Sequence, residues 1–133
     1  MRGHFMTGLK QIAFTALLAA ALALTSSSPA WSHHSHAMFD HDKEVTITGT
    51  VSQYIFRNPH VFLYMDVKND AGETITYTVE FSNLTNMLKM GFSATTFKAG
   101  EKVTVTMHPL NDGRPGGNYI VATTEDGKQL GRL

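Results

Sequence analysis

The sequence contains no cysteine among its 133 residues. This absence excludes disulfide bonds and thiolate metal sites, so the folded chain must be held together by its core alone. Excess charge of one sign is also lacking, because 11 lysine and arginine residues face 11 aspartate and glutamate residues. A protein that binds nucleic acid through phosphates needs a basic face, and we therefore expect no nucleic-acid partner.

A hydrophobic run long enough to span a membrane is also lacking. The longest apolar stretch, Ile12 to Leu24, has 13 residues, whereas a transmembrane helix needs roughly 20. Arg2 and Lys10 supply positive charge before this apolar stretch, and residues 26–32, which follow it, are mostly small and polar. This order is typical of a cleavable secretion signal, so residues 1–32 are predicted to direct export to the periplasm or beyond. We expect no stable membrane span.

Two cleavage positions satisfy the preference for small residues. Cleavage after Ser32 leaves His33 as the new N-terminus, and cleavage after Ala30 leaves Trp31. Cleavage after Ser32 also removes two of the 11 basic residues, so nine Lys and Arg face 11 Asp and Glu, a net charge of about −2. The exported chain divides into a histidine-rich leader, 33–43, and one domain, 44–133.

Hydrophobic and polar residues alternate through most of this domain. The alternation predicts strands from Glu44 to Phe56, His60 to Lys68, Thr74 to Phe81, Lys102 to His108 and Tyr119 to Thr124. Gly49 interrupts the first strand where a bulge or sharp coil is expected. The spacing of Leu84, Met87 and Leu88 predicts a short helix, with Ser82 as its N-cap and Gly91 just beyond its end.

Five strands with one short helix between the third and fourth is the order of the OB-fold, a small barrel closed by a coiled first strand. The sequence therefore predicts an all-β, five-stranded OB-like barrel. A five-stranded open sheet with a packed helix would produce the same order of elements. There is no internal repeat and no low-complexity segment beyond residue 32.

Several segments carry a resemblance to a known family. They are His33-His34-Ser35, Phe39-Asp40, Val45 to Val51, Asn58-Pro59-His60, Gly91-Phe92, and Lys98 to Val105 followed by Gly113 and Gly116. These segments resemble a family of short secreted bacterial proteins of unknown function, along nearly the whole exported chain. The resemblance implies an OB-like barrel and no particular reaction.

The histidines are the sharpest chemical signal. Six of the seven follow residue 32, and His33, His34, His36 and His41 lie within nine residues. Imidazole nitrogens suit copper, zinc and nickel, so this leader predicts a site for copper or zinc. If His33 is the N-terminus, its amine and ring can chelate one ion together. The alternative is a solvated leader whose histidines bind nothing, since a histidine-rich tract is only a compositional hint.

His60 and His108 each adjoin a proline at a strand end, and either could complete a metal site with His33, His34 or His36. Sequence leaves open whether they meet at one end of the barrel or lie at opposite ends. His60 is also compatible with a structural role, in which its ring forms a hydrogen bond to a backbone group at the turn. Met107 is assigned to the core by its alternation, with a soft Cu(I) site as the minor alternative.

A second hypothesis needs no metal. Phe62 and Tyr64, with Tyr54 and Phe56 nearby, form either a stacking platform or a packed inner face, and the loop 111–117 is glycine-rich. An interaction or accessory module would use this loop and the aromatic strand. No nucleophile elbow, phosphate-binding glycine loop or zinc-protease helix is present in the sequence, so we do not expect an enzyme.

Overall fold

The computed structural model describes residues 36–131. The predicted signal peptide, 1–32, and the first leader residues lie outside the described residues, so the predicted export stays a prediction. The elements are, in chain order, the 3-10 helix η1 (His36–Met38), β1 (Val45–Ile55), β2 (Phe62–Lys68), β3 (Thr74–Glu80), α2 (Leu84–Lys89), β4 (Lys102–Pro109), β5 (Gly116–Thr124) and β6 (Gln129–Leu130).

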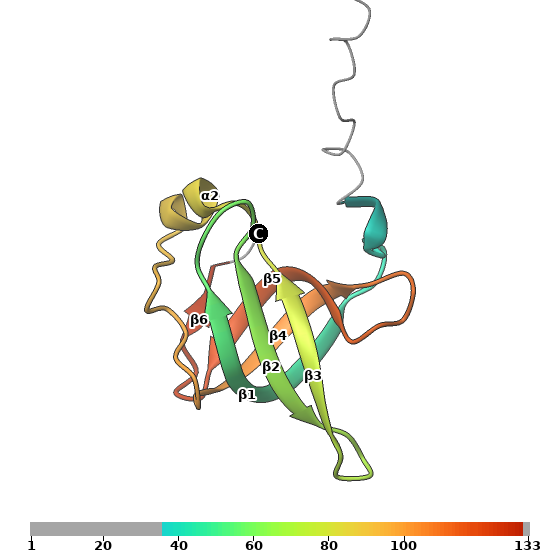
Figure 1. Cartoon of the computed structure of the whole chain (residues 1–133). Helices are drawn as coiled ribbons and strands as arrows, with labels where there is room; N and C mark the ends of the chain where they lie inside the picture. The colour runs from blue at the N-terminus through green and yellow to red at the C-terminus, as the bar shows by residue number, and fades with distance from the viewer. Residues whose placement is uncertain (1–35, 132–133) are drawn as a thin grey trace, which may run out of the picture. The chain divides into compact units, whose positions relative to one another are not determined.

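Five strands close into a barrel (Figure 1). β1 is antiparallel to both β2 and β4, β2 pairs with β3, and β4 pairs with β5. The barrel closes where β3 and β5 run parallel, from Thr78 beside Gly116 to Glu80 beside Asn118. α2 lies between β3 and β4 in the chain, so the predicted OB-like order is confirmed and the open sheet is excluded.

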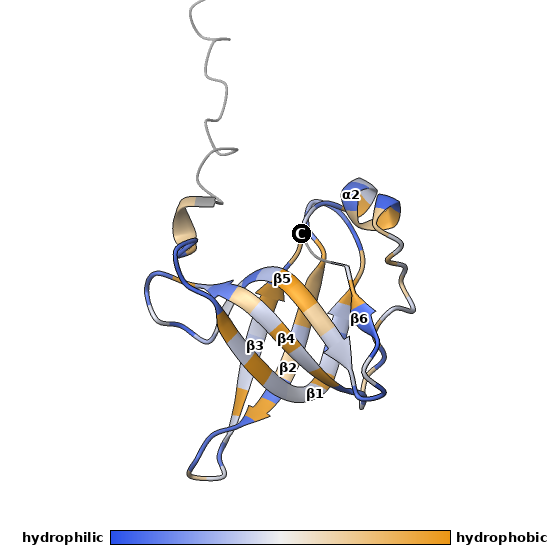
Figure 2. Cartoon of the chain, turned by 180° about the vertical axis from the view of Figure 1, so that it is seen from behind, coloured by the Kyte–Doolittle hydropathy of each residue, from blue (hydrophilic) through white to orange (hydrophobic). Residues whose placement is uncertain are grey.

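Hydrophobic and hydrophilic residues alternate along the strands (Figure 2), and the hydrophobic ones build the core as expected. Leu63, Met65, Val79, Val105 and Met107 are at most 1% exposed, whereas their chain neighbours face outward. Met107 is therefore a core residue. Burial of these apolar side chains supplies the main favourable free energy of folding, at about 25 cal/mol per Å² removed from water.

β1 is long and coiled, but its irregularity does not fall at Gly49. The register with β2 shifts between Val51 and Gln53, and Gly49 has a different role. A Cβ atom at Gly49 would lie 2.6 Å from the backbone oxygen of Asp66, closer than a side chain can tolerate. Glycine there lets β1 and β2 approach closely, a need that strand alternation alone does not reveal.

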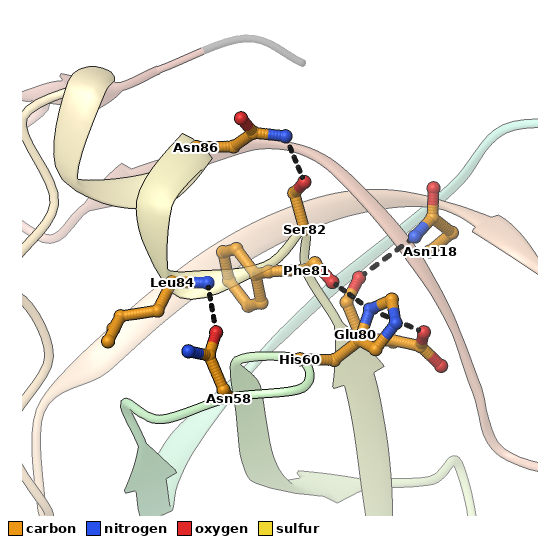
Figure 3. Close-up of polar contacts among 8 residues, drawn as sticks. All are labelled: Asn58, His60, Glu80, Phe81, Ser82, Leu84, Asn86 and Asn118. Atoms are coloured by element: carbon orange, nitrogen blue, oxygen red, sulfur yellow. Dashed lines mark hydrogen bonds and ion pairs between the residues drawn. The ribbon is translucent and has the colours of Figure 1, made fainter.

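The N-terminal end of α2 differs from the prediction by one residue. Asn83, rather than Ser82, is the N-cap, and its side-chain oxygen accepts from the backbone N–H of Asn86 at 3.0 Å. Ser82 accepts instead from the Asn86 side chain (Figure 3). Asparagine and serine cap about equally well, so the sequence gives no basis for choosing between adjacent candidates. Gly91 follows the helix with a φ of 84°, as predicted.

β5 begins at Gly116, three residues before the predicted start, because Gly116 to Asn118 pair with β3 and close the barrel. A Cβ atom on Gly117 would collide with the backbone oxygen of His108. The two-residue strand β6 pairs with β5 and was not predicted. Within residues 36–131, no helix is long and apolar enough to cross a membrane.

Candidate functional site

The second half of the leader is docked on the barrel. Phe39 is 6% exposed and forms a bridge with Leu110, just after β4. The Asn111 side chain donates to the Ala37 carbonyl at 3.0 Å, and its backbone N–H donates to the Met38 carbonyl at 2.8 Å. These contacts fix the direction of the chain as it passes the end of β4. Residues 37–43 are therefore held against the domain.

This docking brings two histidines together. The ring centroids of His41 and His108 are 4.8 Å apart, with an angle of 61° between the ring planes. His41 comes from the turn before β1, and His108 from the end of β4. The register of β1 on β4, with Val45 beside Met107, places the two segments next to each other. We call His41 and His108 the histidine pair.

The protonation of His108 follows from its hydrogen bond. Its Nδ1 lies 2.8 Å from the backbone oxygen of Lys43. A carbonyl oxygen only accepts, so Nδ1 must carry the proton and donate. In the neutral ring this leaves the lone pair on Nε2. Metal-bound histidines are usually held in this way, with one ring nitrogen donating to the protein and the other binding the ion.

A carboxylate and an ammonium group lie beside the histidine pair. Lys43 Nζ is 2.8 Å from Asp40 Oδ2, and this hydrogen bond is the main cause that lowers the pKa of Asp40. Desolvation opposes this effect, while the charge of Lys43, the backbone N–H of Asp42 and, least, the charge of a protonated His108 lower the pKa further. Asp40 and Lys43 therefore carry opposite charges in the segment that contains His41.

His60 lies in a different network (Figure 3). Its Nδ1 is 3.1 Å from both the backbone oxygen of Phe81 and Oε1 of Glu80. Both partners accept, so Nδ1 carries the proton here too. Asn118 on β5 donates to the Glu80 carbonyl at 3.1 Å. The His60 ring thus contacts a backbone carbonyl, but it is that of Phe81 after β3 and not a group of its own turn.

The strand register relates the two networks. His108 is opposite Asn118, and Asn118 is opposite Glu80, so the three residues form one row across β4, β5 and β3. Two strand spacings, about 10 Å, separate His108 from Glu80, the partner of His60. His60 and His108 therefore lie on the same part of the barrel wall, but each is bound to separate partners.

The predicted metal ligands have different outcomes. His33 and His34 lie outside the described residues. His36 begins η1. Among residues 36–131, no group of three or more His, Asp or Glu side chains is close enough to hold a metal ion. Sequence reasoning did not pair His41 with His108. The available signal was weak: a histidine just before one strand and another at the end of the strand that pairs with it.

The aromatic residues separate into two sets. Phe62 and Tyr64 are half-buried on the outer wall, while Tyr54 packs against the core beside Phe81 and Phe97. Burial raises the pKa of Tyr54, whose hydroxyl has no hydrogen-bond partner in the described part of the chain. Phe62 lines a groove of about 380 Å³ between the β2–β3 wall and residues 110–115.

The closed barrel, the helix between β3 and β4, and the groove beside the β4–β5 loop define a small OB-like domain. Residues 21–119 match a family of unknown function, DUF6152, and the chain belongs to this family. No curated protein matches the sequence closely enough to be a relative.

The chain is also similar to two crystal forms of the mitochondrial single-stranded DNA binding protein Rim1 from S. cerevisiae. One form is 12% identical, with a TM-score of 0.48, and the match covers 62% of this chain and 93% of that chain. The other is 11% identical, with the same TM-score, and the match covers 68% of this chain and 98% of that chain.

Proposed function

We propose that this chain is a small exported binding module that holds a divalent transition-metal ion, copper or zinc, through imidazole nitrogens. The observation that carries the proposal is the histidine pair: the two ring centroids are 4.8 Å apart, and His108 donates from Nδ1 to the Lys43 carbonyl, so that in the neutral ring Nε2 carries the lone pair. Export is supported by the three-part signal at residues 1–32. His33, His34 and His36 stay predicted ligands from the sequence.

The ligand chemistry favours copper or zinc over magnesium or calcium. Imidazole is a borderline donor that suits Cu, Zn and Ni, whereas the harder cations prefer sets of oxygen ligands. Two protein nitrogens leave the remaining positions of a bound ion to water or to other ligands. Such a site suits an ion that is exchanged, as in a carrier or accessory protein, better than an ion that holds the fold together.

A nucleic-acid partner is not favoured. The described surface around the histidine pair includes Asp40, Asp42 and Glu44 as well as Lys43. The exported chain carries a small negative net charge, which does not release counterions from a phosphate backbone. We therefore expect the protein not to bind single-stranded oligonucleotides at low salt.

Titration of the secreted protein with Cu(II) and with Zn(II), followed by calorimetry at pH 7 and at pH 5, tests the proposal. Imidazole must lose its proton to bind a metal, so we expect stoichiometric binding at pH 7 and an affinity at least about tenfold lower at pH 5. Intact mass first establishes whether His33 is the N-terminus. An equal affinity at the two pH values would indicate carboxylate ligands instead, and no binding at pH 7 would end the metal hypothesis.

A further inference from the structure

Residues 37–43 of the leader pass the end of β4, and we call them the strap. The backbone N–H of Asp40 donates to the Pro109 carbonyl at 2.9 Å, and that of Asn111 donates to the Met38 carbonyl at 2.8 Å. Five of the seven strap residues are exposed. A short, exposed segment that is held by a few hydrogen bonds opens locally more often than the core strands of a barrel.

The histidine pair spans the contact between the strap and the barrel. His41 lies in the strap, in a turn that is closed by a hydrogen bond from the Lys43 N–H to the Asp40 carbonyl at 3.1 Å. His108 lies on β4, where it is paired with Asn118 of β5. The pair therefore joins a segment that opens easily to a strand that does not.

One metal ion can reach both rings. In a tetrahedral zinc site, two imidazole nitrogens that are each about 2.0–2.1 Å from the ion lie roughly 3.4 Å from each other. Ring centroids 4.8 Å apart are compatible with that separation. Nδ1 of His108 donates to the Lys43 carbonyl, which leaves Nε2 for the ion. When the strap opens, the two rings separate and the ion keeps only one of them.

We infer that the metal ion acts as a clasp that fastens the strap to the barrel, an inference that rests on the proposed metal site. An ion that binds the docked form more tightly than the open form shifts the equilibrium toward docking by the ratio of the two affinities. Met38 and Phe39 of the strap line the groove beside Phe62. Metal loading thereby controls how long this wall of the groove stays in place.

Hydrogen exchange of single backbone amides at pH 7, followed by NMR with and without Zn(II), tests the clasp. The reporters are the amides of Asp40 and Asn111, because each donates across the contact between strap and barrel. Without zinc, both should exchange faster than the amide of Phe81, which donates to the Val61 carbonyl within the barrel. Saturating zinc should slow the exchange of both reporters at least about tenfold.

H41A and H60A separate the clasp from a general effect of bound zinc. H41A removes the ligand on the strap and keeps His108, so saturating zinc should slow the reporters by less than about twofold. H60A removes a histidine that lies in the network of Glu80, and in this variant zinc should slow the reporters as much as in the unaltered protein.

Coupling between two sites is reciprocal, so a strap that is loosened must also bind zinc less well. F39A removes the buried ring that docks against Leu110, whereas F39L keeps an apolar side chain at this position. Neither variant removes a ring nitrogen. We expect the affinity for zinc, measured by calorimetry, to fall at least about threefold in F39A and to stay within about twofold in F39L.

The possible failures are distinct. Zinc that binds in calorimetry without slowing either reporter would overturn the clasp and leave the proposed metal site intact. No zinc binding at pH 7 would remove both. Reporters that zinc slows equally in H41A and in the unaltered protein would overturn the clasp, as would an F39A protein with unprotected reporters and an unchanged affinity for zinc.

Discussion

H108A is expected to weaken the binding of Cu(II) at pH 7 by roughly 10- to 100-fold. The variant removes one of two adjacent imidazoles, and the ring removed is the one that the Lys43 carbonyl orients. The barrel should stay folded, because the His108 side chain points outward from the end of β4 beside buried Met107. Competitive titration with a chromophoric chelator measures the affinity, and circular dichroism confirms the fold.

H60A is the matched control for this variant. His60 has the same side chain and a similar hydrogen bond to a backbone carbonyl, but its ring lies against Glu80 rather than beside another histidine. We expect H60A to change the affinity for Cu(II) by less than about threefold. A separate H33A/H34A variant measures the leader. A large loss in H33A/H34A with none in H108A would show that metal binding belongs to the leader alone.

F81A is expected to lower the free energy of unfolding by about 3–5 kcal/mol. Phe81 is fully buried just after β3, and its ring stacks on Tyr119 with centroids 4.0 Å apart. The rings of Phe92 and Phe97 lie within 6.1 Å of it. Without disulfide bonds or a larger core, a domain of about 100 residues loses a large part of its stability in this way. Urea denaturation followed by circular dichroism gives the value.

F62A is the corresponding control on the other face of the same sheet. Phe62 is opposite Glu80 on the outer wall and is only half-buried, so its removal leaves no enclosed cavity. We expect a loss of about 1 kcal/mol. Equal losses in F62A and F81A would contradict the assignment of inner and outer faces in β2 and β3.

The fold was accessible from sequence because alternation reports directly on burial. Leu63 and Met65 face inward and Phe62 and Tyr64 outward, as the period of two requires. Barrel closure was accessible only through the order of the elements. The pairing of Gly116 to Asn118 with β3 joins segments that are far apart in the chain, and no local pattern encodes it. Gly49 likewise responds to the backbone of Asp66, a neighbour that sequence does not name.

The candidate site was predicted only in part. Composition identified the residue type, imidazole, and placed four histidines directly after the predicted signal peptide. It did not identify the partner of His108, because that depends on the docking of Phe39 against Leu110 and on the register of β1 with β4. These are tertiary contacts. For His60 the sequence offered a backbone hydrogen bond at its own turn, whereas its ring contacts the carbonyl of Phe81, which follows β3 and is another tertiary partner.

The most direct test of the metal site is long-range ¹H–¹⁵N NMR of the histidine rings during titration with Zn(II). Without zinc, the neutral ring of His108 should carry its proton on Nδ1, as its bond to the Lys43 carbonyl requires. With zinc, we expect the Nε2 resonance of His108 and one ring resonance of His41 to shift, while His108 Nδ1 stays protonated and the His60 signals do not move. Unshifted His41 and His108 resonances in the presence of bound zinc would contradict the histidine pair as the site.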